Sequence, residues 1–144
     1  MNRTGRVRAI PAWVVAGVFA LAGCGNSPED TAVPECGNIH FPESAHIVYQ
    51  TGDQEFSGEA HVEVVAEFPA AQLADFTTAS RLGEFTAGVP SNWQKHYWQD
   101  SGVADTLGAE TNENFSDWDG TTGRQVVIHH LDADTVRVFT RGWC

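Results

Sequence analysis

Six histidines have the clearest potential for metal binding or acid–base chemistry in this chain of 144 residues. His61 and His129 fall in segments with the residue pattern of strands, and they would share one face of a sheet if those strands are neighbours. His130 would point to the other face, because successive strand residues alternate sides. No HxH, HExxH or HxxxH spacing occurs in the chain. We therefore interpret the histidines as exposed or hydrogen-bonded, and the sequence predicts no metal site.

The segment 117–120 (DWDG) is the candidate for a calcium loop. An EF-hand loop needs oxygen ligands at its first and last positions and a glycine at its sixth. With Gly120 at the sixth position, Phe115 would be first and Val126 last, so the pattern fails. We favour a turn built on the Asp-Gly pair, with an irregular calcium site as the alternative.

Motifs for nucleophilic or nucleotide-dependent catalysis are absent from the sequence. There is no GxSxG elbow, SxxK pair, Walker loop or dinucleotide-binding fingerprint. The acidic residues are too numerous for one catalytic pair to stand out. We therefore predict no catalytic residue and no cofactor, and we favour a protein that is not an enzyme.

Large aromatic side chains are the candidate ligand-binding residues. Trp93, Tyr97, Trp98 and Trp118 are many large rings for a chain of this length, and aromatic rings can serve as platforms for sugars. The same residue types also fill protein cores. Core packing is the favoured interpretation, and an exposed binding patch is the alternative.

The first 24 residues have the pattern of a secretory leader. Arg3, Arg6 and Arg8 precede an apolar run over residues 9–22 that contains no acid. Spanning a bilayer takes about 20 apolar residues, so this run, which Pro11 interrupts, is too short for a permanent transmembrane helix. Ala20-Leu21-Ala22 would suit an ordinary signal peptidase, but a cysteine follows two residues later, at position 24.

The stretch Leu21-Ala22-Gly23-Cys24 resembles the lipobox of bacterial lipoproteins. The resemblance implies that the sulfur of Cys24 becomes a thioether carrying lipid, and that the chain is then cut before it. It further implies a leader over 1–23. Residues 25–35 lack apolar periodicity and hold two prolines and three acids, so we predict a lipidated and flexible tether over 24–35 before one globular domain over 36–144. Two or more acyl chains give stable attachment, so the protein is expected on the extracytoplasmic face of the cell membrane.

The charge of the chain excludes one class of partner. The leader holds three of the eight basic residues and none of the nineteen acidic ones, which leaves a net charge of −14 from Cys24 onward. A surface this acidic repels phosphate backbones, so we predict no nucleic-acid binding. Solubility is the favoured reason for the charge, and a cationic partner is the alternative.

Cys36 and Cys144 remain once Cys24 is lipidated, and two thiols in an exported chain most simply pair. The bond would close a loop of about 109 residues, which stabilises a fold by up to ~4–5 kcal/mol in the chain-entropy model. Free thiols and a metal site are the alternatives. We predict a disulfide that joins the two ends of the domain.

Apolar periodicity predicts four strands, over 45–51, 60–68, 124–131 and 135–141. In the second strand, Val62, Val64, Ala66 and Phe68 would face a core, whereas His61, Glu63 and Glu67 would face solvent. A helix is expected over 70–81, opened by Pro69, and a short helix over 91–98. The polar stretch 99–123 is predicted as a long loop with a short piece of structure near 103–107. The order predicts an α+β domain: a four-stranded antiparallel sheet under one covering helix.

The stretch Phe41-Pro42-Glu43-Ser44-Ala45, with the hairpin and helix after it, is similar to small uncharacterised lipoproteins of actinobacteria. That resemblance implies a fold pattern and no activity. Because catalytic motifs are absent, we favour a membrane-anchored, non-catalytic domain that binds an envelope protein, a glycan or a small molecule. A hydrolase of cell-wall material and a cation-binding sensor are the alternatives.

Overall fold

A computed structural model describes residues 36–54, 60–91, 93, 98, 102–108, 110–118 and 122–143 of the chain. The predicted leader and tether, with Cys24, lie outside the described residues, as do Tyr97 and Cys144. Within the described part, no helix has the length and apolar character needed to cross a membrane.

The described residues form an antiparallel sheet of six strands, with one α-helix and two short 3-10 helices. The strands lie in the spatial order β1-β2-β6-β5-β4-β3. Their bounds are β1 His46–Gln54, β2 Ala60–Pro69, β3 Thr86–Ala87, β4 Asn112–Trp118, β5 Gly123–His130 and β6 Thr135–Trp143. The helical elements are η1 Ala70–Gln72, α2 Leu73–Ala79 and η4 Ala104–Thr106. The α+β class is confirmed, but the prediction of four strands is wrong.

The four strands that the sequence predicts correspond to β1, β2, β5 and β6, and their ends differ by a few residues. These strands carry the regular apolar alternation, and they lie next to one another in the sheet, with β1 at its edge. A short turn joins β5 to β6, as the spacing of the two predicted strands requires. There the Asp132 carboxylate accepts hydrogen bonds from the backbone amides of Asp134 and Thr135, both at 2.8 Å.

Strand β4 lies within the stretch that the sequence predicts as a long loop. Its Asn, Ser and Asp residues favour turns by local propensity. The strand forms because seven residues pair in register with β5, from Asn112 opposite His129 to Trp118 opposite Gly123. Buried Asn112 is satisfied by the η4 segment, where its Nδ2 donates to the Thr106 carbonyl at 2.8 Å. Tertiary pairing therefore overrides local propensity here.

Strand β3 lies at the edge of the sheet opposite to β1, and it pairs with β4 through only two residues. A side chain extends this short ladder: Asn114 Nδ2 donates to the carbonyls of Thr86 and Gly88, both at 3.1 Å. A two-residue strand has no periodicity to read, which is why sequence patterning misses it.

One face of the sheet packs against α2, as predicted. Phe76 of this helix is buried against Phe68, with ring centroids 5.3 Å apart, in an apolar cluster that includes Ile39, Val126 and Val138. The predicted helix over 70–81 is shorter than expected, because its first turn is the 3-10 helix η1 and α2 ends at Ala79. Arg81 then turns the chain with φ 51°.

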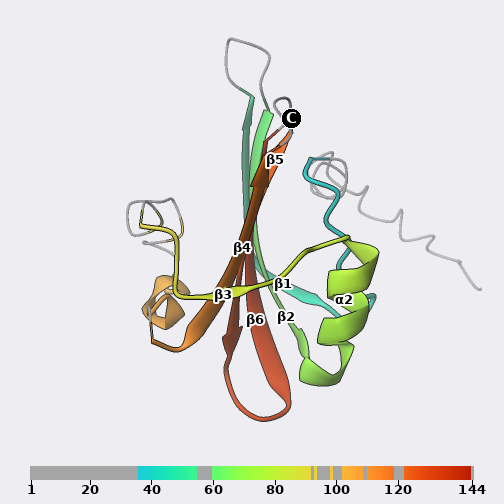
Figure 1. Cartoon of the computed structure of the whole chain (residues 1–144), viewed down its shortest axis with the longest axis vertical. Helices are drawn as coiled ribbons and strands as arrows, with labels where there is room; N and C mark the ends of the chain where they lie inside the picture. Colours follow the sequence, from blue (N-terminus) through green and yellow to red (C-terminus); the bar gives the residue numbers. More distant parts are fainter. Residues whose placement is uncertain are drawn as a thin grey trace, which may run out of the picture.

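The opposite face of the sheet is also covered, so the prediction that it faces solvent is wrong. Figure 1 shows α2 and η4 on opposite sides of the sheet. On the η4 side, Trp93 and Trp98 pack onto Val65 and Phe139. The four side chains are fully buried. Glu63, expected on a wet face, is buried there as well. The cause is the segment after β3, whose two tryptophans supply a second apolar layer.

Cys36 takes part in a disulfide, and its partner is not among the described residues. No disulfide joins two described residues, so the pairing of Cys36 with Cys144 stays a prediction. The backbone of Cys36 lies tightly against β6. A side chain at Gly142 would place its Cβ 2.4 Å from the Cys36 carbonyl oxygen, so only glycine fits there.

Candidate functional site

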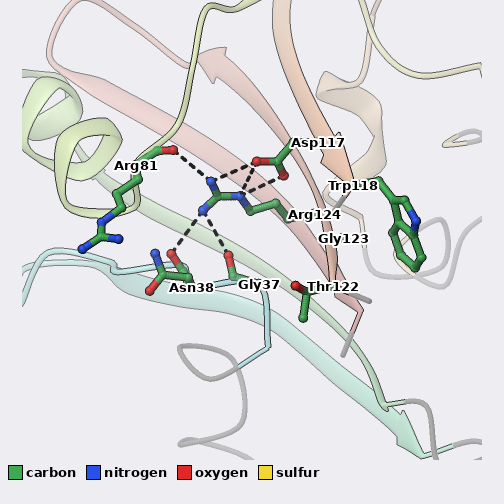
Figure 2. Close-up of a pocket in the computed structure, with 8 residues that line it drawn as sticks. All are labelled: Gly37, Asn38, Arg81, Asp117, Trp118, Thr122, Gly123 and Arg124. Carbon is green, nitrogen blue, oxygen red and sulfur yellow. Dashed lines mark hydrogen bonds and ion pairs between the residues drawn. The ribbon is translucent and has the colours of Figure 1, made fainter. Parts of the chain in front are cut away.

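A cavity of about 370 Å³ opens at the end of the sheet where β4 finishes and β5 begins. Its volume falls at the lower end of the range for small-molecule sites, roughly 300–1,000 Å³. Three separate parts of the chain line it: the start of the domain, the residue after the helix and the β4–β5 pair. The lining residues are Gly37, Asn38, Arg81, Asp117, Trp118, Thr122, Gly123 and Arg124. Figure 2 shows Arg124 at the centre of this group, with Arg81 and Trp118 on opposite sides.

Arg124 holds the three parts together. Its Nε and Nη2 donate to the carboxylate of Asp117, its partner across the strand pair, at 3.0–3.2 Å. Nη1 donates to the Gly37 carbonyl at 3.2 Å and to the Ser80 carbonyl. Nη2 also donates to the Arg81 carbonyl at 2.9 Å. All three nitrogens of the guanidinium are thus engaged by the protein, which gives Arg124 a structural role in the floor of the cavity.

The geometry around Arg124 follows from helix and loop chemistry. The last carbonyls of a helix have no partner within the helix, and a nearby arginine can satisfy them. The carbonyls of Ser80 and Arg81 follow directly after α2 and reach Arg124 in this way. On the other side, Gly37 and Asn38 both have positive φ, 92° and 51°.

Trp118 is the exposed aromatic side chain of the cavity, with 61 % of its surface accessible. It lies over Gly123, its partner across β4 and β5. A Cβ at Gly123 would come within 2.1 Å of the Trp118 ring, so the ring covers the bare glycine backbone. Aromatic side chains often shield strand glycines in this way. One side of the ring is therefore against the protein while much of its surface remains accessible.

Asp117, Asn38 and Arg81 are exposed polar side chains that line the cavity. The Asp117 carboxylate is 46 % exposed, although Arg124 fixes its orientation. Asn38 is exposed, and its Oδ1 lies 2.9 Å from Nε2 of His40. That contact leaves Nδ2 as the donor available from Asn38, since no described residue accepts a bond from it. Asp117 and Asn38 thus present a fixed acceptor and a donor beside an aromatic ring, and Arg81 adds further donors.

The sequence-predicted ligand residues divide between core and cavity. Trp93 and Trp98 are fully buried, with ring centroids 4.8 Å apart, so the core interpretation holds for both. The indole N–H of Trp93 donates to Gln125 at 2.7 Å. Tyr97 and most of the predicted helix over 91–98 lie outside the described residues. Trp118 lines the cavity.

The histidines are dispersed over the fold. His61 and His129 do share one face of the sheet, but they pair with Trp143 and Arg137, six residues apart along β6. Among the described residues, no three His, Cys, Asp or Glu side chains gather closely enough to hold a metal ion. Asp119 and Gly120, the core of the predicted turn and of the calcium alternative, lie outside them.

His129 has an unusual environment on the η4 side of the sheet. Its Nδ1 lies 2.9 Å from Oδ1 of Asn112. Burial lowers the pKa of His129 below its ordinary value of 6.5, and the charges of Arg137 and His130 lower it further. The neutral ring, donating from Nδ1 to the amide oxygen, is therefore the favoured form.

Two arginine–glutamate pairs lie on the same face as His129. Glu63 is completely buried, and its Oε1 lies 2.8 Å from Nε of Arg141. The same oxygen lies 3.3 Å from Nε2 of His61. Glu67 pairs with Arg137 at 2.6 Å, and the Glu67 side chain is 26 % exposed. Glu63 and Arg141 have further interactions within the protein. These groups stabilise the sheet under its second apolar layer and do not reach the cavity.

Sequence reasoning missed the centre of the cavity. The sequence places Arg124 only as the first residue of a strand, and Asn38 belongs to no motif. Two sequence features point to this region: the candidate aromatic residue Trp118, which lines the cavity, and the polar stretch before β5, which the sequence predicts as a turn. Positions across two strands become neighbours only when the register is known.

Comparison with known proteins identifies no relative: no protein-family description, no curated protein and no solved structure matches this chain.

Proposed function

We propose that this protein is a lipid-anchored binding protein of the bacterial envelope, and that it holds a small ligand in the cavity around Arg124. The protein has no catalytic role in this proposal. It is attached to the extracytoplasmic face of the membrane through Cys24, and residues 36–144 form its binding domain.

The cavity is the observation that carries the binding role. Arg124 orders the floor through bonds to Gly37, to the two residues after α2 and to Asp117 of β4, so the site exists before a ligand arrives. Preorganisation of this kind favours binding, because less ordering is left to do when the ligand enters. The exposed Trp118 and the fixed Asp117 carboxylate stand at its edge.

The leader pattern supports the anchor. A basic start, a short apolar run and Leu21-Ala22-Gly23-Cys24 are the features that export and lipidation require. Mass spectrometry of the N-terminal peptide from native membranes should find Cys24 as the first residue with fatty acyl mass. A chain that begins elsewhere, or that carries no acyl group, would contradict the anchor.

We also propose Cys144 as the disulfide partner of Cys36. The carbonyl of Cys36 lies against Gly142, two residues before Cys144, and the oxidised state of Cys36 requires a partner. Peptide mapping without reduction should recover the peptides of Cys36 and Cys144 joined. Recovery of Cys36 joined to a different thiol would overturn the pairing.

The binding role is tested by the thermal stability of the purified lipoprotein in a concentrated, low-mass extract of its own envelope. A ligand that binds the folded state raises stability by about 2.7 kcal/mol at a hundredfold excess over Kd. We expect a rise in Tm that Asn38→Gly reduces and that Glu113→Gln, an exposed change on β4, leaves unchanged. The absence of any rise would contradict a binding role, and consumption of an extract component would indicate an enzyme instead.

A further inference from the structure

The charges within the cavity narrow the class of ligand. Arg124 is committed to the protein, with its side chain only 12 % exposed, so it offers little to a ligand. The accessible charges are the carboxylate of Asp117 and the exposed side chain of Arg81, which oppose each other in sign. A net charge on the ligand would be attracted by one and repelled by the other. The balance favours a neutral, polar molecule.

The hydrogen-bonding groups of the cavity limit the class of ligand further. An ionised carboxylate has about four acceptor positions, and Arg124 occupies part of them. The exposed remainder of Asp117 accepts bonds, and Nδ2 of Asn38 donates them. A hydroxyl group is both donor and acceptor, so vicinal hydroxyls match a site that offers one of each.

The ring of Trp118 is the third feature of the cavity that limits the class of ligand. Its accessible surface is apolar and negative at the face, which suits the weakly positive C–H groups of a saturated ring. Neighbouring residues of a strand point to opposite faces of a sheet. Asp117 and Trp118 nevertheless both line the cavity, because it lies at the end of the β4–β5 pair, where both faces are accessible. Its volume admits a small ligand or one terminal unit of a chain.

We propose that the ligand is a neutral saccharide unit, with its C–H face on Trp118 and its hydroxyls on Asp117 and Asn38. This inference rests on the proposed function, since it names the ligand class of the same cavity. Arg81 closes the opposite side and adds donors to the outer hydroxyls. Carbohydrate affinity at such a site is modest, because each hydroxyl exchanges bonds with water for bonds with protein.

The test uses the lipidated protein in a sugar-free detergent, since glycoside detergents would compete for the site. Isothermal titration is carried out with neutral disaccharides (chitobiose, mannobiose and galactobiose). Glucuronic acid and inorganic phosphate serve as anionic probes and spermidine as the cationic probe. We expect at least one neutral disaccharide to bind, with little dependence on salt.

Two substitutions locate the binding. Trp118→Ala should weaken it by about tenfold or more, as truncation of an aromatic anchor does elsewhere. Asn38→Gly should weaken it severalfold without loss of Tm, because glycine keeps the positive φ of this position. Glu113→Gln is the matched control and should change nothing.

The outcomes separate the ligand class from the proposed function. Binding of phosphate, glucuronic acid or spermidine that depends on Asn38, without binding of a disaccharide, overturns the saccharide and leaves a binding site. Disaccharide binding that survives both substitutions places the sugar elsewhere and overturns the proposal. If no probe binds, the saccharide proposal fails, and the extract experiment decides the binding role by itself.

Discussion

Arg124 and Arg141 lie on neighbouring strands and each pairs with a carboxylate across a strand pair, yet their surroundings differ. Arg141 meets a carboxylate of Glu63 that is 0 % exposed, and its guanidinium lies over the ring of Trp143. Arg124 meets Asp117 at the rim of a cavity, and its other bonds go to backbone carbonyls. An arginine–carboxylate pair thus stabilises the buried sheet at Arg141, whereas a similar pair at Arg124 orders a cavity that a ligand can reach.

Burial decides how much stability is lost when one member of such a pair is removed. Removing one member of a buried pair leaves a charge without compensation, whereas an exposed carboxylate is hydrated at once. Substitutions in the Arg141–Glu63 pair should therefore mainly lower stability, and substitutions in the Arg124–Asp117 pair should mainly weaken ligand binding. Four substitutions test this division, from the largest expected effect to the smallest.

Glu63→Gln should have the largest effect. It leaves the Arg141 guanidinium buried without its counter-charge, and we expect a loss of about 3–5 kcal/mol in the free energy of unfolding. Urea denaturation of the disulfide-intact protein measures this. Glu67→Gln is the control, since its pair has similar geometry but a carboxylate that is 26 % exposed. Equal losses for the two variants would contradict the role of burial.

Arg124→Met should rank second. It removes the charge-assisted bonds to the carbonyls of Gly37, Ser80 and Arg81, which typically contribute roughly 1.5–3 kcal/mol. Arg81→Met, an exposed change beside it, should stay within about 0.5 kcal/mol of the wild type. Because the floor of the cavity is lost, ligand binding should fall together with stability in Arg124→Met. A variant that binds normally would show that Arg124 does not order the site.

Asp117→Asn should have a small effect on stability, about 0–1 kcal/mol, because the pair is partly exposed. Its effect on binding should be much larger, since the fixed acceptor of the cavity is weakened. Urea denaturation and the titrations described above measure the two quantities on the same preparation. A large loss of stability with unchanged affinity would reverse the division between the two centres.

We expect the smallest effect from His129, through the dependence of stability on pH. His129 has a pKa lowered below 6.5 in the folded protein, first by burial and then by the charges of Arg137 and His130. The unfolded chain therefore binds more protons than the folded one as the pH falls through 6.5, so His129 reduces stability below that pH and has no such effect well above it.

His129→Gln should therefore flatten the fall in unfolding free energy on the acid side of pH 6.5, relative to wild type. His46→Gln, at an exposed histidine of β1, is the control. Denaturation at a series of pH values measures the slope. An unchanged slope in His129→Gln would show that the buried face does not disfavour the charged imidazole.

Local pattern alone was sufficient for much of this fold. The alternation in β2, β5 and β6, the Asp132 turn and the helix after Pro69 were all readable, because each depends on residues close together in the chain. The α+β class followed from their order. The leader pattern ending at Cys24 is equally local, and it stands as a prediction from the sequence.

Tertiary structure alone decided the rest. Strand β4 exists because its backbone pairs with β5 in register, although its residues favour turns. Trp93 and Trp98 became core, and Glu63 became buried, because the segment after β3 crosses the second face of the sheet. The cavity joins Asn38, Arg81 and Arg124, which lie more than 40 residues apart from one another. Contacts over such separations depend on register and packing, and no local pattern of residue types encodes them.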